Sequence, residues 1–250
     1  MLHRNTIINV ISIWILFSGL SAAHAAGLNG QIFKPKGAGP HPAIILLHAC
    51  GGLRGPVIDF WPAFWTKQGY VVYSHDTFAA MGVDRCSRRW VVGSADGRRD
   101  DALAALGALA ARKDVDAKRI AVMGGGMGAI TVNVLAARGT TSPKGNSFKA
   151  GIAMYGNCII LDRSGTQAEF PVAVFLGDKE PRRYQDSCKA VQDQKNVTLH
   201  LLPGVYRAFD NPRHKSARQD HIGLKLLYDP NAVKTVQKLG AAFFEKHLGR

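Results

Sequence analysis

The glycine-rich turn at residues 124–128 marks the place where this sequence could attack a substrate. An apolar segment ending at Met123 runs into Gly124-Gly125-Gly126-Met127-Gly128 and then into a segment of helical character. A strand, a sharp Gly-x-Ser/Cys-x-Gly turn and a helix present the attacking oxygen or sulfur in many enzymes that transfer acyl groups. The residue between the flanking Gly124 and Gly128 is Gly126, which has no side chain and cannot attack a carbonyl carbon.

A carboxylate follows a later apolar segment. Phe175-Leu176-Gly177 leads directly into Asp178, just beyond the expected end of a strand. A carboxylate at such a place can orient a catalytic imidazole. Asp178 could instead cap the following helix or pair with Lys179 or Arg182, but its position favours the role of the acid.

Four segments, in this order and at this spacing, resemble the dienelactone hydrolase family of α/β-hydrolases. They are Leu46-Leu47-His48-Ala49-Cys50-Gly51-Gly52, the turn at 124–128, Gly177-Asp178-Lys179-Glu180-Pro181, and Pro203-Gly204-Val205-Tyr206-Arg207-Ala208-Phe209-Asp210. The resemblance covers roughly residues 27–248. It implies an α/β-hydrolase fold in which nucleophile, acid and histidine follow one another along the chain.

The resemblance also implies a second substitution. Family members usually carry the catalytic histidine before Ala-Phe or Gly-Phe in the last of these segments, and here that position is Arg207. Arginine stays protonated, so it cannot act as a general base. We expect Arg207 to pair with Asp178, or to hold a carboxylate or phosphate through two hydrogen bonds beside the turn at 124–128, which we call the elbow. Glycine at 126 would also relieve the strain of a positive φ.

The oxyanion-binding elements are closer to the family pattern. The N–H of Met127 begins a helix, and the loop after His48, with Ala49 and Cys50, would offer a second donor. The resemblance gives His48 a structural role, as a hydrogen-bonding partner that shapes this loop. Neither a cofactor nor a metal site is expected.

The elements that position these groups alternate between strands and helices, which is typical of a mostly parallel central sheet with helices on both faces. Apolar runs predict strands at 43–48, 70–75, 120–123, 149–155, 171–176 and 197–202, and helices at 60–68, 98–113, 127–138, 184–194 and 231–247. No linker or repeat divides the chain, so residues 26–250 are expected to form one α/β-hydrolase domain.

Residues 1–25 have the features of a signal peptide. A weakly basic start precedes the apolar run Ile7 to Leu20, and Ala23-His24-Ala25 fits a cleavage site. The run is shorter than the ~20 residues of a spanning helix, which favours cleavage over retention as an anchor. No later segment is expected to cross a membrane, and we expect a periplasmic or secreted protein.

The four cysteines are Cys50, Cys86, Cys158 and Cys188. In an oxidising compartment an even number suggests disulfides, and four cysteines allow three pairings. We favour Cys50–Cys86 and Cys158–Cys188, because each pair would join loops that follow neighbouring strands. The alternative is free, buried thiols.

The formal net charge is +14, and no nucleic-acid motif accompanies the basic residues. A solvated basic surface would explain this charge, and a preference for small anionic molecules is the more specific hypothesis. Our first functional hypothesis is therefore a secreted protein that cannot use the nucleophile–histidine–acid mechanism and binds a small, anionic ligand.

Two other hypotheses remain open. One is an active ester or lactone hydrolase that uses displaced groups. Its nucleophile would be a free thiol of Cys50 or Cys158, and its base would be His75, His214 or His221. The other is an interaction module that binds a protein partner through its basic surface.

Overall fold

Seven strands form one sheet at the centre of the molecule. In this computed structural model the described residues are 28–79, 82–86, 95–139, 141–163, 165–220 and 222–249. The strand order is β1-β3-β2-β4-β5-β6-β7, and every neighbouring pair is parallel except β1 with β3. The expected signal peptide and His221 lie outside the described residues.

The strands are β1 Gly30–Phe33, β2 His41–Leu47, β3 Val71–His75, β4 Val115–Gly125, β5 Gly151–Met154, β6 Val172–Gly177 and β7 Val197–Leu202. The helices are α1 Phe60–Lys67, α2 Ala95–Ala110, α3 Met127–Arg138, α4 Arg182–Lys189 and α5 Pro230–Leu248. A small hairpin of β8 Arg218–Gln219 and β9 Lys225–Leu226 precedes α5.

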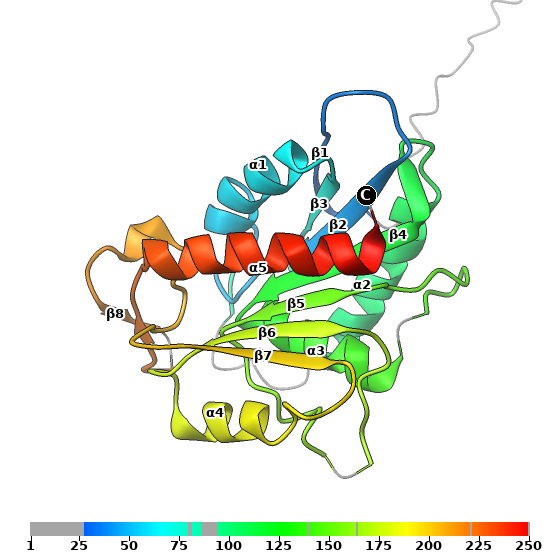
Figure 1. Cartoon of the computed structure of the whole chain (residues 1–250). Helices are drawn as coiled ribbons and strands as arrows, with labels where there is room; N and C mark the ends of the chain where they lie inside the picture. The colour runs from blue at the N-terminus through cyan, green and yellow to red at the C-terminus, as the bar shows by residue number, and fades with distance from the viewer. Residues whose placement is uncertain are drawn as a thin grey trace, which may run out of the picture.

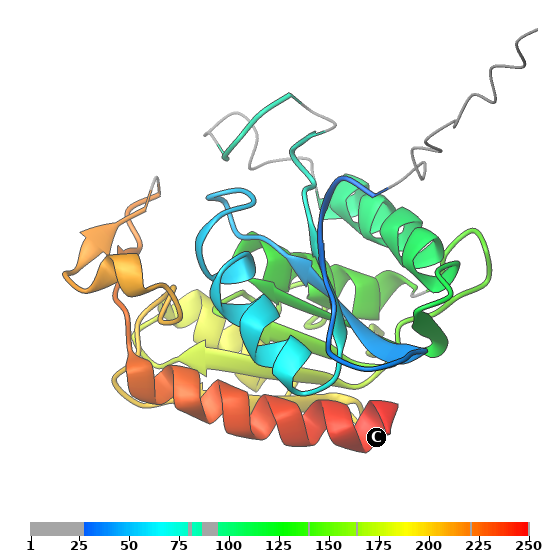
Figure 2. The same cartoon turned by 90° about the horizontal axis from the view of Figure 1, so that it is seen from above.

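Helices cover both faces of the sheet, as the sequence predicts (Figures 1 and 2). On one face α1 and α5 bury an aromatic layer that includes Trp61, Trp65 and Phe244. On the other face α2 and α3 pack against the sheet through residues such as Leu106 and Val132. The central strands are buried on both faces, which explains their uninterrupted apolar sequences.

The predicted strands and long helices are found with small shifts of their ends. Two features are absent from the prediction. Strand β1 is short and half exposed, and the hairpin strands β8 and β9 have two residues each, so none carries a strong apolar pattern. Within the described ranges, no helix has the length and apolar character needed to cross a bilayer.

Candidate functional site

The turn between β4 and α3 has the geometry of a nucleophile elbow without the nucleophile. Gly126 has φ 56° and ψ −112°, a left-handed conformation that strains any residue with a side chain. Its N–H donates to Met154 O at 3.0 Å. A Cβ at this position would lie 3.4 Å from Ala49 Cβ, 3.5 Å from Arg207 Nη2 and 3.6 Å from Tyr155 Cε2. The elbow therefore points at an arginine nitrogen.

The loop after β2 has its carbonyl groups held by the protein. His48 O accepts from Arg98 Nη2, Ala49 O from His48 Nδ1, and Cys50 O from the Cys86 N–H, each at 2.8 Å. The N–H groups of Ala49 and Cys50 make no hydrogen bond within the described part of the chain. Met127 opens α3, so its N–H has no acceptor within the helix. These N–H groups are therefore free to donate to an acceptor oxygen, as the predicted oxyanion-binding role would require.

His48 has the structural role that the resemblance implies. Its Nδ1–H donates to the Ala49 carbonyl, and its Nε2 accepts from the Thr77 N–H at 3.2 Å, so the ring is a neutral tautomer. Burial, with a further contribution from the Arg98 guanidinium, lowers the pKa of His48 to about 4. This imidazole therefore shapes the loop and is not poised to exchange a proton at neutral pH.

Arg207 pairs with Glu180, and the expected pairing with Asp178 is wrong. Arg207 Nη1 contacts both carboxylate oxygens of Glu180, at 3.1 and 3.2 Å, and Arg207 Nε lies 3.9 Å from Asp220. Tyr155 and Tyr184 flank the guanidinium, with ring centroids 6.0 and 5.8 Å from Cζ. Because Nη1 is hydrogen-bonded to Glu180, only Nη2 of the guanidinium is available to a ligand. The bidentate contact that we expected would need a second free nitrogen.

Asp178 lies beside the loop of Arg207, where its carboxylate accepts a hydrogen bond from the backbone. Its carboxylate accepts from the Gly204 N–H at 2.8 Å and lies 3.9 Å from Lys179 Nζ. Of the alternatives drawn from the sequence, the contact with Lys179 is present. The two acids differ in burial, because the side chain of Asp178 is 31% exposed and that of Glu180 is 1% exposed.

Asp210 is a buried carboxylate that connects Trp61 and Tyr155 by hydrogen bonds. Asp210 accepts from Trp61 Nε1 at 2.8 Å and from the Tyr155 hydroxyl at 3.0 Å. Burial raises the pKa of Asp210, and burial likewise raises the pKa of Glu180 against the opposing effect of Arg207. Tyr155, with φ 43°, and Ala208, with φ 53°, hold left-handed conformations beside the elbow. Such strain is typical of positions that the surrounding structure fixes.

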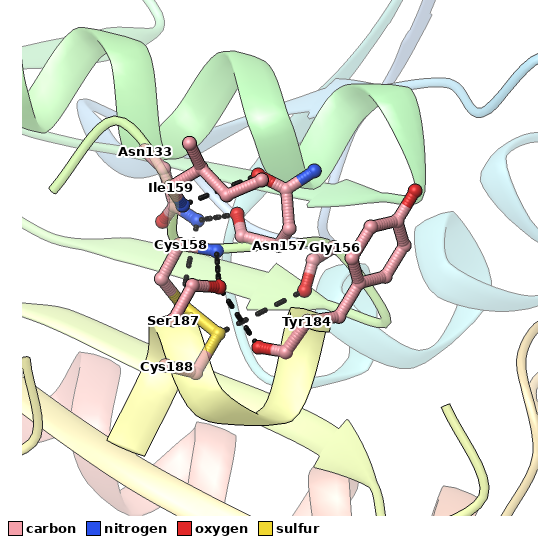
Figure 3. Close-up of a disulfide and its surroundings, with 8 residues drawn as sticks. All are labelled: Asn133, Gly156, Asn157, Cys158, Ile159, Tyr184, Ser187 and Cys188. Atoms are coloured by element: carbon pink, nitrogen blue, oxygen red, sulfur yellow. Dashed lines mark hydrogen bonds between the residues drawn. A yellow bond between two sulfur atoms is a disulfide. The ribbon is translucent and has the colours of Figure 1, made fainter. Parts of the chain in front are cut away.

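Both predicted disulfides are confirmed. Cys50–Cys86 and Cys158–Cys188 each have a Cα–Cα separation of 4.8 Å, and no described cysteine is free. The second bond ties the segment after β5 to α4 (Figure 3). There the Cys158 N–H donates to Ser187 Oγ at 3.1 Å. With these bonds formed, neither Cys50 nor Cys158 offers the thiol that a displaced mechanism would need.

The proposed substitute bases are engaged elsewhere or lie outside the described residues. His75 Nε2 lies 2.6 Å from Asp101 and its Nδ1 lies 2.9 Å from the Tyr73 hydroxyl. His214 Nε2 accepts from the side chain of Asn211 at 3.2 Å. His221 is not among the described residues. Both described histidines are therefore held by hydrogen bonds to other side chains.

Sequence reasoning missed the partners of Arg207. Glu180 stands within the segment that carries the resemblance, but nothing in the sequence tells that it, rather than Asp178, turns inward. Asp220 and Tyr155 give no sequence signal. Arg98 likewise gives no sequence signal, and in the structure it is 2% exposed and reaches the loop after β2.

The arrangement supplies hydrogen-bond donors, and Gly126 and Arg207 offer neither a nucleophile nor a general base. Among the described residues no cluster of His, Cys, Asp or Glu could hold a metal ion. A shallow cavity bordered by Thr166 and Gln194 lies before β6 and β7, at the opposite end of these strands from the elbow.

Comparisons with known proteins agree with this fold. A family model described as "Dienelactone hydrolase family" matches residues 28–248. A dienelactone hydrolase-like promiscuous phosphotriesterase from metagenomic libraries is 21% identical, with 85% of this chain and 89% of that chain covered and a TM-score of 0.67. A thermophilic esterase from the planctomycete Thermogutta terrifontis is 18% identical, with 89% and 93% covered and a TM-score of 0.59. No curated protein sequence matches the chain.

Proposed function

This chain belongs to the dienelactone hydrolase family, and we propose that it is a secreted member that binds a small anionic molecule at the elbow without hydrolysing it. The proposal separates two abilities that the family fold combines. One is attack on a carbonyl, which needs a nucleophile and a base. The other is stabilisation of a negatively charged oxygen, which needs only fixed donors.

The position of Arg207 Nη2 carries the proposal. It lies 3.5 Å from where the Cβ of a nucleophile would stand at residue 126. A donor therefore occupies the space into which an attacking side chain would project. Of the three atoms nearest to that Cβ position, Arg207 Nη2 is the only polar one, and it would act together with the N–H groups of Met127 and Ala49.

The charges around these donors favour an anion. The N-terminus of α3 carries partial positive charge, and Gly126 provides no side-chain cap for it. Arg207 is compensated by Glu180, but Arg98, behind the Ala49 peptide, has no carboxylate within hydrogen-bond distance among the described residues. A carboxylate or phosphate oxygen would complement both the donors and this field.

Two disulfides support an oxidising compartment. Together with the signal-peptide features of residues 1–25, they favour a periplasmic or secreted location. An anionic ligand would then be a small molecule met outside the cytoplasm.

The test uses the mature protein and two measurements. Hydrolysis of p-nitrophenyl acetate and of a simple lactone should not exceed background, whereas benzoate or inorganic phosphate should raise the melting temperature and shift the amide resonances of Ala49 and Met127. A double variant, Gly126→Ser with Arg207→His, should gain weak esterase activity and lose anion binding. Ester hydrolysis by the wild type that disappears in Asp178→Ala would overturn the proposal.

A further inference from the structure

Arg98 is a buried cation whose placement stability alone does not explain. It lies on α2, is 2% exposed, and donates from Nη2 to His48 O at 2.8 Å. Its Nε and Nη1 are also buried and have no hydrogen-bond partner among the described residues. Burial lowers the pKa of Arg98 to about 10, which leaves it charged at neutral pH. The charge is offset by the hydrogen bond to the His48 carbonyl, by the Phe78 ring 5.3 Å from Cζ and by the charge of Asp101. These contacts still leave two buried guanidinium nitrogens unpaired among the described residues, which costs stability.

The hydrogen bond from Arg98 to the His48 carbonyl fixes a peptide at the elbow. The bond between His48 and Ala49 is trans and planar, so the Ala49 N–H points away from the His48 carbonyl. Because Arg98 holds that carbonyl from the α2 side, the Ala49 N–H is directed away from α2. The Ala49 Cβ lies 3.4 Å from the Cβ position of residue 126, so this peptide borders the elbow.

We infer that Arg98 is the positioning residue of the anion site, which holds the His48–Ala49 peptide so that the Ala49 N–H faces the ligand and donates more strongly. The second effect follows from charge, since a cation on the carbonyl oxygen polarises the peptide toward a more acidic N–H. The inference rests on the proposed function, because it assigns one of the donors of that site.

The neighbouring contacts show why Arg98 is needed for this peptide alone. The Ala49 carbonyl is held by the His48 ring, and the Cys50 carbonyl by the Cys86 N–H. The His48 carbonyl has no other hydrogen-bond donor among the described residues. Removing Arg98 would therefore allow the His48–Ala49 peptide to rotate, while the carbonyl groups of Ala49 and Cys50 keep their hydrogen bonds.

Arg99 provides a matched control on the same helix. Its Nη2 also donates to a backbone carbonyl, that of Arg138 at 3.1 Å, at the opposite end of α3 from the elbow. Arg98→Met should weaken benzoate binding at least tenfold and move the Ala49 amide resonance in the free protein. Arg98→Lys, which restores a cationic donor, should recover most of both. Arg99→Met should leave the affinity and the Ala49 resonance unchanged.

The outcomes separate this inference from the proposed function. Wild-type affinity for benzoate in a folded Arg98→Met variant, or equal losses in Arg98→Met and Arg99→Met, would overturn the role of Arg98. If the wild type bound neither benzoate nor phosphate, the proposed function would fail. The Ala49 resonance of the free Arg98→Lys and Arg98→Met proteins would then still decide whether Arg98 orients that peptide. If Arg98→Met did not fold, Arg98→Gln would take its place as the uncharged variant, and wild-type affinity for benzoate with a wild-type Ala49 resonance in Arg98→Gln would contradict the inference.

Discussion

Arg207 Nη1 lies 3.1 and 3.2 Å from the two carboxylate oxygens of Glu180, in a pair whose acid is 1% exposed and whose base is 11% exposed. A triad histidine in this position would need a carboxylate to orient its ring. Arginine needs one to balance its charge, and it finds that acid two residues beyond Asp178. The substitution at 207 thus depends on an inward-facing acid that differs from the one at the triad position.

Glu180→Gln should lower the free energy of unfolding by about 3–5 kcal/mol, because breaking one side of a buried ion pair leaves the other charge unpaired. Asp178→Asn should cost about 0–1 kcal/mol, since its lysine contact is exposed. Urea unfolding of both variants at neutral pH measures the difference. A larger loss in Asp178→Asn than in Glu180→Gln would mean that Arg207 relies on Asp178 after all.

Gly126→Ala should destabilise the protein by about 1–3 kcal/mol, the cost of a positive φ for a residue with a side chain. The added methyl has room, since its nearest neighbour would be Ala49 Cβ at 3.4 Å. Gly97, within α2, has open space around a Cβ. Gly97→Ala should therefore stabilise by roughly 0.5–1 kcal/mol. Thermal unfolding of both variants checks the prediction, and losses of equal size would contradict the elbow conformation.

Replacing either pair of cysteines with serine should cost about 2–4 kcal/mol, because the bonds close chain loops of similar length. Only removal of Cys50–Cys86 should also weaken anion binding, since Cys50 belongs to the loop that supplies donors. Mass spectrometry after alkylation without reductant should find no modified cysteine in the wild type. Binding that weakens equally in both double variants would argue against a special role for the loop of Cys50.

The His48 ring should remain neutral as the pH falls from 7 to 5, because its folded pKa is about 4. The unfolded chain takes up this proton near pH 6.5, so His48 contributes stability that is present above that pH and is lost as the pH falls toward the folded value. The slope from this group is at most about 1.4 kcal/mol per pH unit.

Nitrogen-15 NMR of the His48 ring gives the protonation state directly, and His48→Gln should show a shallower loss of stability between pH 6.5 and 4. A ring that becomes cationic near pH 6.5 would contradict the hydrogen bonds assigned to Nδ1 and Nε2.

The sequence by itself predicted every strand of the central sheet except β1, the sharp glycine turn at 124–128 and the favoured pairing of the four cysteines, and the family resemblance implied the roles of positions 126 and 207. These predictions follow from local signals, namely continuous apolar runs, the glycines of the turn at 124–128, and cysteines placed after neighbouring strands. The tertiary structure alone decided which acid faces Arg207. Asp178 and Glu180 stand two residues apart in one turn, and the direction of each side chain depends on the loop after β7.

The same holds for Arg98, which reaches a carbonyl fifty positions away in sequence. In the sequence it is one basic residue among many on a positively charged chain. Its burial depends on how α2 packs beside the end of β2, which no local pattern encodes. The residue types at the elbow are visible in the sequence. The groups that balance the charge of Arg207 and orient the Ala49 peptide come from segments that meet only when the sheet and its helices assemble.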